Sequence, residues 1–141
     1  MNAERIELDK RLLKSFYLSK GYYNVEIVSS SAESKDNNTE IELTYSINAG
    51  DRYRIKKLST DIDPVFDNSM FADLKDEFTS YAGEYYSPFK IQKILTKIDK
   101  IVDQNELQFV QHTVRETVDG KNIDIVFKIF EGPKIQIERV N

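Results

Sequence analysis

The 141-residue chain is 40% hydrophobic and 31% charged, which is ordinary for a soluble globular protein of one or two small domains. Its net charge of −4 and its scattered lysines argue against nucleic acid as a partner, because phosphate binding draws on a basic patch. The absence of cysteine excludes disulfides and thiolate metal sites. No apolar run approaches the roughly 20 residues of a membrane helix, and no signal peptide is visible, so an export leader would lie outside this sequence.

The first third of the chain predicts one helix and two strands. Residues 4–20 carry apolar side chains at helical spacing, and Gly21 stands where a left-handed cap ends a helix. Residues 24–30 predict a short strand, residues 29–38 a polar loop, and residues 40–48 a strand with one buried and one wet face. The expected buried side chains are Leu8, Leu12, Leu13 and Phe16 on the helix and Ile41, Leu43, Tyr45 and Ile47 on the second strand.

The middle of the chain predicts a strand followed by two helices. Residues 52–60 form the strand, which Pro64 ends, and residues 67–81 form a helix with an acidic first turn that suits the helix dipole. Ser87 then offers an N-cap and Pro88 a first helical residue. The helix that follows has the most regular apolar stripe in the chain, made of Ile91, Ile94, Leu95, Ile98, Ile101 and Val102.

The last third predicts a hairpin. Residues 107–118 form its first strand, although two adjacent apolar residues, Phe109 and Val110, leave the apolar phase unclear. Asp119 and Gly120 indicate a tight turn. Residues 122–131 form the second strand, whose inward side chains are Ile123, Ile125, Phe127 and Ile129.

The chain contains an internal repeat. Gly132 follows Gly50 by 82 residues, and at this offset residues 5–58 lie against residues 87–140 without a gap. Apolar positions agree while polar positions vary, as expected for a repeated module whose core is fixed by packing. Residues 52–131 then form a complete strand–helix–helix–strand–strand module, with a helix–strand–strand piece before it and a single strand, residues 134–140, after it.

The sequence offers little for catalysis or metal binding. His112 is the only histidine, and without cysteine or a carboxylate cluster at ligand spacing it reads as a surface or partner-facing residue. The acidic residues between 61 and 67 lack the glycine and the bidentate glutamate of a calcium loop. The glycines are isolated, so no phosphate-binding loop is present, and no GxSxG motif occurs. The tyrosine pairs at 22–23 and 85–86 could bind a peptide, but such tyrosines more often pack at a helix–sheet edge.

Four phrases, in their order and spacing, resemble the POTRA repeats of BamA-family outer-membrane protein assembly factors. They are FYLSKGYYNV (residues 16–25), NAGDRYRIKKL (48–58), GEYYSPFKIQKI (83–94) and EGPKIQIERV (131–140). The resemblance covers nearly the whole chain. Two positions depart from it: Leu58 is followed by Ser-Thr-Asp where the family often has Gly-Asn, and Asp103 and Gln104 stand where a second helix often ends in Gly-Tyr.

The resemblance implies an α+β fold of tandem βααββ modules, each a three-stranded sheet covered by two helices. Residues 1–51 would be the C-terminal part of one module, residues 52–133 a complete module, and residues 134–141 the first strand of the next. The phrase at residues 83–94 is most similar to the fourth of five repeats, which would make the first piece part of the third.

The resemblance also implies a non-catalytic protein without cofactors on the periplasmic side of the outer membrane of a Gram-negative bacterium. Its partners would be unfolded outer-membrane proteins and the lipoproteins of the assembly complex, with a C-terminal barrel beyond this sequence as the membrane anchor. The modules would act as a jointed scaffold whose edge strands accept a strand of the partner. The expected edge residues are Val25, Ile27, Ser29, Phe109, Val110, His112 and Val114, and the expected inter-module joint contains Gly50, Tyr53 and Gly132.

Several alternatives stay open. Charged side chains or neighbouring repeats could blunt the strand edges. A two-partner-secretion transporter is a relative that also carries POTRA repeats. A nucleic-acid binder of the KH type shares the βααββ order, but it needs a GxxG loop that residues 81–87 lack. An enzyme has no motif behind it.

Overall fold

The computed structural model describes residues 3–33 and 41–133 of the chain, which divides into two compact units. The first unit comprises Met1–Arg54 together with Tyr85–Phe89, and the second comprises Ile55–Glu84 together with Lys90–Asn141. The elements in chain order are α1 (Ala3–Ser19), β1 (Glu26–Glu33), β2 (Ile41–Asn48), β3 (Arg54–Ile62), the 3-10 helix η1 (Asn68–Phe71), α2 (Leu74–Tyr81), α3 (Pro88–Gln104), β4 (Val110–Asp119) and β5 (Asn122–Glu131).

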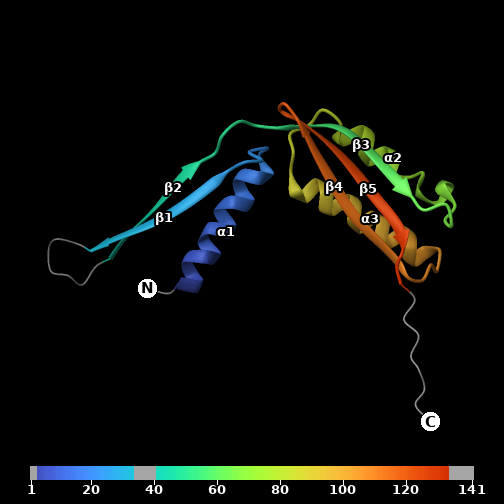
Figure 1. Cartoon of the computed structure of the whole chain (residues 1–141), viewed down its shortest axis with the longest axis horizontal. Coiled ribbons are helices and arrows are strands. Elements are labelled where there is room, and N and C mark those ends of the chain that lie inside the picture. Colours follow the sequence, from blue (N-terminus) through green and yellow to red (C-terminus); the bar gives the residue numbers. More distant parts are fainter. Residues whose placement is uncertain (1–2, 34–40, 134–141) are drawn as a thin grey trace, which may run out of the picture. The chain divides into compact units, whose positions relative to one another are not determined.

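The first unit is built from α1 and the β1–β2 hairpin (Figure 1). The two strands pair antiparallel, from Glu26 opposite Asn48 to Glu33 opposite Ile41. Helix α1 packs mainly against β1. Gly21 follows the helix with a φ of +95°, which confirms the left-handed cap expected there.

The apolar surfaces predicted to be buried in the first unit are largely exposed, so that part of the prediction is wrong. A two-stranded hairpin and one helix bury little surface, and the buried hydrophobic residues described in this unit are Val25 and Tyr86, at 4% and 6% exposure. The half-buried members of the two predicted faces are Leu13, Leu43 and Tyr45. The exposed members are Leu8, Leu12, Phe16, Ile41 and Ile47.

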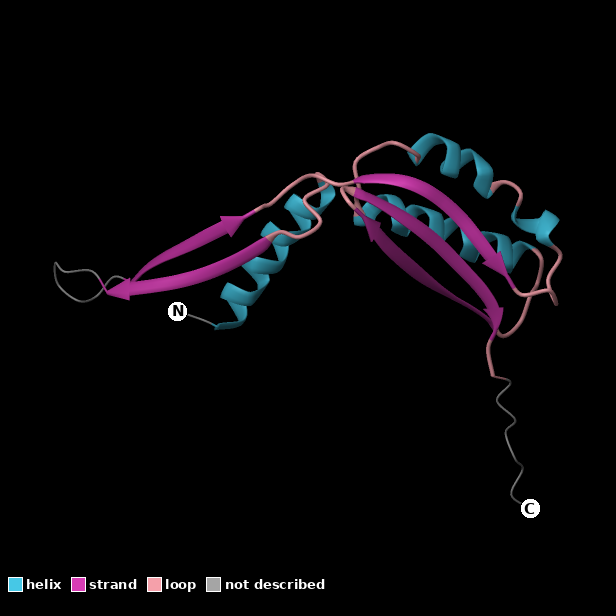
Figure 2. Cartoon of the chain, turned by 45° about the horizontal axis from the view of Figure 1, so that its top comes forward, coloured by secondary structure: helices cyan, strands magenta, loops and turns pink. Residues whose placement is uncertain are grey.

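The second unit is a three-stranded sheet in the order β3-β5-β4 (Figure 2). β4 and β5 form an antiparallel hairpin whose last pair is Asp119 opposite Asn122. β3 and β5 run parallel, as their arrows in Figure 1 show, and beyond the end of β3 the N–H of Asp63 donates to the carbonyl of Ile129 at 2.8 Å. The order strand, helix, helix, strand, strand is the predicted βααββ module.

One face of this sheet forms the core of the second unit. The ring of Phe78 on α2 stacks on that of Phe127 on β5 at 5.7 Å, so α2 lies on this face. α3 carries the most regular buried stripe in the described chain, as the sequence predicts. The buried side chains are Ile91, Ile94, Ile98 and Ile101 on α3, Phe71 and Leu74 before and on α2, Ile55 on β3, and Ile123, Ile125, Phe127 and Ile129 on β5.

Side-chain caps start η1 and α3. The N–H of Phe89 donates to Ser87 Oγ at 3.2 Å and Pro88 is the first residue of α3, which confirms both expectations. The N–H of Ser69 donates to Asp67 Oδ1 at 3.0 Å, and this hydrogen bond lowers the pKa of Asp67. The single helix predicted over residues 67–81 is wrong, because the segment forms η1 and then α2, with a break at residues 72–73.

Lys97 ties α3 to α2. Its Nζ donates to Glu77 Oε2 at 2.7 Å and to the carbonyl oxygen of Asp73 at 2.9 Å. The hydrogen bond from Lys97 lowers the pKa of Glu77, and the same bond raises the pKa of Lys97. Because the folded pKa of Glu77 lies below its ordinary value of 4.5, the stability it contributes is present above that pH and is lost as pH falls through the folded pKa.

Replacing Lys97 with methionine should therefore lower the free energy of unfolding of the second unit at neutral pH. The free energy of unfolding should also decrease less steeply as the pH falls. The expected cost is about 0.2–1 kcal/mol, the range for ion pairs with solvent access. Urea unfolding measured between about pH 7 and pH 3 checks this, with the exposed Lys100→Met on the same helix as the matched control. An acid-dependent loss as steep in Lys97→Met as in the wild-type chain would show that the pair does not stabilise the fold.

The structure corrects the spacing of the repeat. α1 and α3 begin 85 residues apart, at Ala3 and Pro88, and they also end 85 apart, at Ser19 and Gln104. The offset of 82 predicted for the whole repeat holds for the second strands, because Ile47 pairs with Ile27 while Ile129 pairs with His112. The connection between the hairpin strands, residues 34–40 in the first unit, absorbs the difference.

The corrected spacing explains two irregular residues. Glu106 is the counterpart of Gly21, and it adopts a φ of +53° without being glycine. The departure from Gly-Tyr thus lies at Glu106 and Leu107, not at Asp103 and Gln104. Phe109, with a φ of +59°, precedes β4 and is exposed, which accounts for the unclear apolar phase at Phe109 and Val110.

Candidate functional site

β4 is an edge strand, and alternate residues direct their backbone polar groups away from the sheet. The N–H of Gly132 donates to the carbonyl of Phe109 at 2.6 Å, so these residues form a hydrogen-bonded pair just before β4 begins. Such pairs alternate along an antiparallel ladder. The N–H and C=O groups of the even-numbered residues from Val110 to Val118 therefore point away from β5. Within the described residues, β5 is the only strand that pairs with β4.

The predicted edge residues of the second unit lie mostly on this strand. Val110, His112 and Val114 are half-buried and direct their backbone groups outward, whereas Phe109 lies just before the strand. His112 Nε2 is 2.9 Å from Asp99 Oδ1 of α3, so the side chain of His112 spans the gap between strand and helix. This contact is a bridge between β4 and α3. No group of three or more metal-ligand side chains occurs in residues 3–33 and 41–133.

β1 is the corresponding edge in the first unit. The pair Ile27–Ile47 has the same place in its hairpin as His112–Ile129 in the second unit, so the N–H of Ile27 also points away from its partner strand. Ile27 and Ser29 are half-buried, and Val25 lies just before the strand. In the described part of the chain, β2 is the only strand that pairs with β1.

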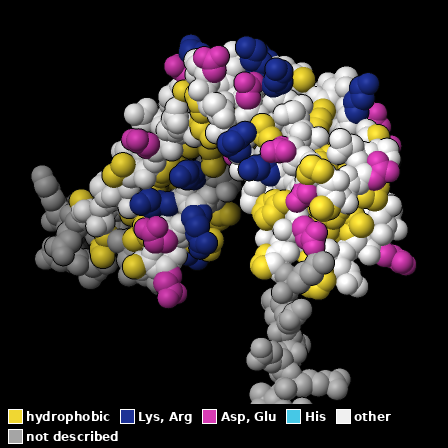
Figure 3. Space-filling view, turned by 45° about the vertical axis from the view of Figure 1, so that its right-hand side comes forward, with side chains coloured by type: hydrophobic (Ala, Val, Ile, Leu, Met, Phe, Trp, Pro, Cys, Tyr) yellow, Lys and Arg dark blue, Asp and Glu magenta, His cyan; other side chains and the backbone are white. Residues whose placement is uncertain are grey.

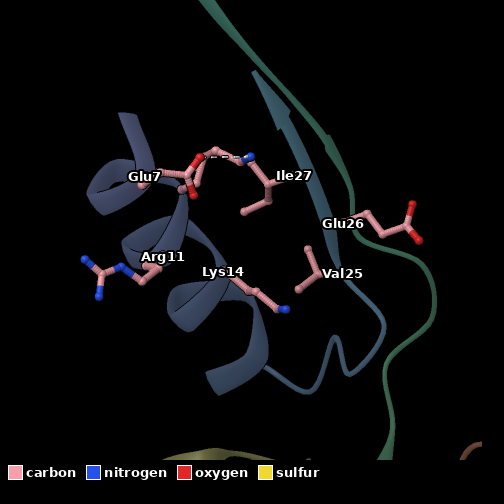
Figure 4. Close-up of a pocket in the computed structure, with 7 residues that line it drawn as sticks. Glu7, Arg11, Lys14, Val25, Glu26 and Ile27 are labelled. Carbon is pink, nitrogen blue, oxygen red and sulfur yellow. Dashed lines mark ion pairs between the residues drawn. The ribbon is translucent and has the colours of Figure 1, made fainter. Parts of the chain in front are cut away.

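A groove of about 340 Å³ runs between α1 and the edge of β1. Figure 4 shows Lys14 reaching from α1 toward Val25, while Arg11 and Glu26 point away from the groove. Lys10 pairs with Glu7 at 3.7 Å on the same helix. In Figure 3, Lys and Arg side chains lie among apolar ones on this unit. The groove therefore combines an apolar floor, basic side chains and an unpaired strand edge, although the sequence did not single out its lysines.

The predicted joint residues have different surroundings. Gly50 has a φ of +70° and no atom within 4 Å of where a Cβ would lie. Tyr53 is held firmly, since its N–H donates to the carbonyl of Gly21 at 2.7 Å and its OH accepts from Asn24 Nδ2 at 2.9 Å. Gly132 is buried and its missing Cβ leaves room for the side chain of Gln111.

Tyrosines 85 and 86 pack within the first unit although they precede α3 in sequence. The guanidinium of Arg52 lies 3.4 Å from the centre of the Tyr85 ring, and that of Arg54 lies 4.0 Å from it. Tyr86, which is buried, meets Tyr23 edge to face at 4.8 Å. Aromatic packing is thus the role that the structure gives these tyrosines, as the sequence favoured.

The family model "Surface antigen variable number repeat", called POTRA, matches residues 1–50. BamA from Haemophilus ducreyi lacking POTRA domains 1–3 shares the fold, with a TM-score of 0.69 and 15% identity over 93% of this chain and 24% of that chain. POTRA1-2 of the periplasmic domain of Omp85 from Anabaena gives a TM-score of 0.56 and 10% identity over 96% of this chain and 77% of that chain. Residues 1–50 thus match the POTRA family model, and the chain shares the fold of POTRA domains of BamA proteins.

The POTRA fold and the resemblance predicted from the sequence are therefore confirmed. The outer membrane protein assembly factor BamA of Neisseria meningitidis serogroup B (strain ATCC BAA-335 / MC58) is 20% identical over 99% of the chain. The POTRA segment spans 18% of the length of that relative. The periplasmic location expected from the sequence agrees with the Anabaena segment, which is part of a periplasmic domain.

None of the helices in the described residues is both long and apolar enough to cross a bilayer. The strand predicted over residues 134–140 lies outside the described residues.

Proposed function

We propose that this POTRA segment binds unfolded outer-membrane proteins by adding one of their strands to β1 or β4. The observation that carries the proposal is the outward direction of alternate N–H and C=O groups on β4, from Val110 to Val118. A backbone with such groups can hydrogen-bond an extended peptide of almost any sequence. That tolerance suits a set of partners that share β-strand character and little else.

The proposal includes the wider setting that the relatives suggest. The segment would belong to an outer-membrane protein assembly factor and work in the periplasm without catalysing a reaction, as a jointed scaffold. Residues 1–51 would be the C-terminal part of one module, residues 52–133 a complete module and residues 134–141 the start of another. Accessory lipoproteins would be further partners, and a C-terminal barrel would anchor the whole protein.

The exposed apolar side chains of the first unit support the division into modules. Phe127 in the second unit is covered by Phe78 of α2, and Tyr45 is its counterpart at the offset of 82. In the first unit a shallow apolar hollow lies beside Tyr45, lined by Leu12 and Phe16. The missing strand and helix of a complete module would cover this hollow.

Proline substitutions test strand addition, because proline removes the N–H that an added strand would accept from. Ile27→Pro and His112→Pro each remove one outward N–H, and the double variant removes both. With about 1 kcal/mol per hydrogen bond, each single variant should weaken binding of a synthetic outer-membrane strand peptide about fivefold at its own edge, and the double variant should do so at both edges. Fluorescence anisotropy with the labelled peptide measures the affinity.

The neighbouring residues give matched controls. Val28→Pro and Thr113→Pro remove N–H groups that point into the hairpins, so they should lower the melting temperature more than the outward variants do. Circular dichroism shows which variants stay folded. Peptide affinity that is unchanged in the folded double variant would refute strand addition at these edges.

A further inference from the structure

The edges of β1 and β4 are not equivalent, because the neighbouring helices carry side chains of opposite charge at the same position of the repeat. At the spacing of 85 residues that relates α1 to α3, Lys14 corresponds to Asp99 and Ile27 to His112. Both pairs lie at the same place, between the helix and the outer edge of the hairpin. The same position between helix and strand edge therefore holds a lysine and an isoleucine in the first unit, and an aspartate and a histidine in the second.

In the first unit this position is open and basic. Lys14 reaches toward Val25 across the groove of about 340 Å³ (Figure 4). Lys14 and Arg11 form no ion pair within residues 3–33 and 41–133, whereas Lys10 is paired with Glu7. The apolar side chains of Val25 and Ile27 line the groove beside the strand edge.

In the second unit the same position is bridged. His112 Nε2 lies 2.9 Å from Asp99 Oδ1, and the imidazole occupies the place that the shorter, apolar Ile27 leaves open. A side chain entering here from an added strand would have to displace this contact. A carboxylate would in addition approach Asp99, which carries the same charge.

Resting on the proposed function, we propose that the groove between α1 and β1 is the receptor for an extended peptide that carries a carboxylate on its face toward α1. An added strand directs every second side chain to that face. An Asp or Glu there pairs with the ammonium of Lys14, while apolar neighbours lie on Val25 and Ile27. The bridge between His112 and Asp99 keeps the equivalent position of the second unit closed to the same peptide.

The test uses the full chain and two strand peptides that differ only in a central Glu or Lys facing α1. The wild-type chain should bind the Glu peptide about fivefold more tightly, the upper range for an exposed ion pair. Lys14→Asp should reverse that preference, and Lys14→Gln should abolish it. The change at exposed Lys14 leaves the core untouched, and circular dichroism checks that both variants fold.

A transplant of the groove gives the matched control. His112→Ile with Asp99→Lys copies the side chains of the first unit into the second, so the number of Glu peptides bound should rise from one to two. Disulfide trapping locates them, since the chain has no cysteine of its own. The equivalent positions for the trap are Ser30→Cys on β1 and Arg115→Cys on β4, with a cysteine in the peptide.

The outcomes separate this inference from the proposed function. Trapping at Ser30→Cys alone in the wild-type background, with Lys14-dependent charge preference, supports the inference. Equal trapping at both positions, or a preference that survives Lys14→Asp, overturns it while strand addition still stands. Failure of both peptides to bind any variant overturns the inference and the proposed function together.

Discussion

Replacing Ile98 with alanine should lower the free energy of unfolding of the second unit by about 2–5 kcal/mol. Ile98 is fully buried on the face of α3 that also carries Ile94 and Ile101. Removing its outer carbons loses their transfer free energy and leaves a cavity, because the side chains around a fully buried position collapse only in part.

The repeat supplies the control for this truncation. Leu13 corresponds to Ile98 at the spacing of 85 but is only half-buried, and Leu12 beside it is 61% exposed. Leu12→Ala should change stability by no more than about 0.5 kcal/mol, as for an ordinary surface substitution, with Leu13→Ala in between. Urea unfolding followed by circular dichroism gives the three values. A loss for Ile98→Ala as small as that for Leu12→Ala would mean that α3 does not pack as the structure shows.

The second unit could be predicted closely from sequence because its signals agree at every level. Period-two alternation on β5 and a 3.6-residue stripe on α3 both point to one core, and Ser87 with Pro88 fixes where α3 begins. In such a module the apolar face of the helix and the apolar face of the sheet bury each other. The side chains that the apolar patterns predict to be buried are therefore the ones that the packing buries.

The first unit could not be predicted in the same way, since an apolar pattern does not say whether anything covers it. Leu12 and Phe16 keep the spacing of a buried helix face, yet both are exposed beside Tyr45. The polar bond from Tyr45 OH to Asp9 Oδ2 at 3.2 Å occupies a position that Ile94 fills in the second unit. Burial depends on which other elements cover a surface, and the apolar pattern of one helix does not report that.

The groove lysine was missed because the repeat was aligned by its glycines. At an offset of 82, Lys14 falls against Thr96, and the contrast with Asp99 is hidden. Hairpin loops accept insertions at little cost, so an offset taken from the second strands need not hold for the helices. The positive φ at Glu106 could not be predicted from the sequence, because glutamate rarely adopts this backbone conformation.

Replacing Gly21 with alanine should destabilise the first unit by about 2–4 kcal/mol, from backbone strain and overpacking together. A side chain at a φ of +95° is strained wherever it occurs. Here the added Cβ would also lie 3.1 Å from the carbonyl oxygen of Tyr53 and 3.2 Å from Cβ of Tyr85. The backbone of Tyr53 cannot give way easily, because its N–H is bonded to the carbonyl of Gly21 itself at 2.7 Å.

Gly50→Ala separates the two causes. Gly50 also has a positive φ, of +70°, but its added Cβ would meet no atom within 4 Å. It should therefore show the backbone cost alone, about 1 kcal/mol. Hydrogen–deuterium exchange resolved by peptide should show faster exchange around Tyr53 and Tyr85 in Gly21→Ala than in Gly50→Ala, since these tyrosines surround Gly21 and not Gly50. Equal effects of the two substitutions would mean that the chain tolerates a side chain against Tyr53, and that the glycine at residue 21 serves only to end α1.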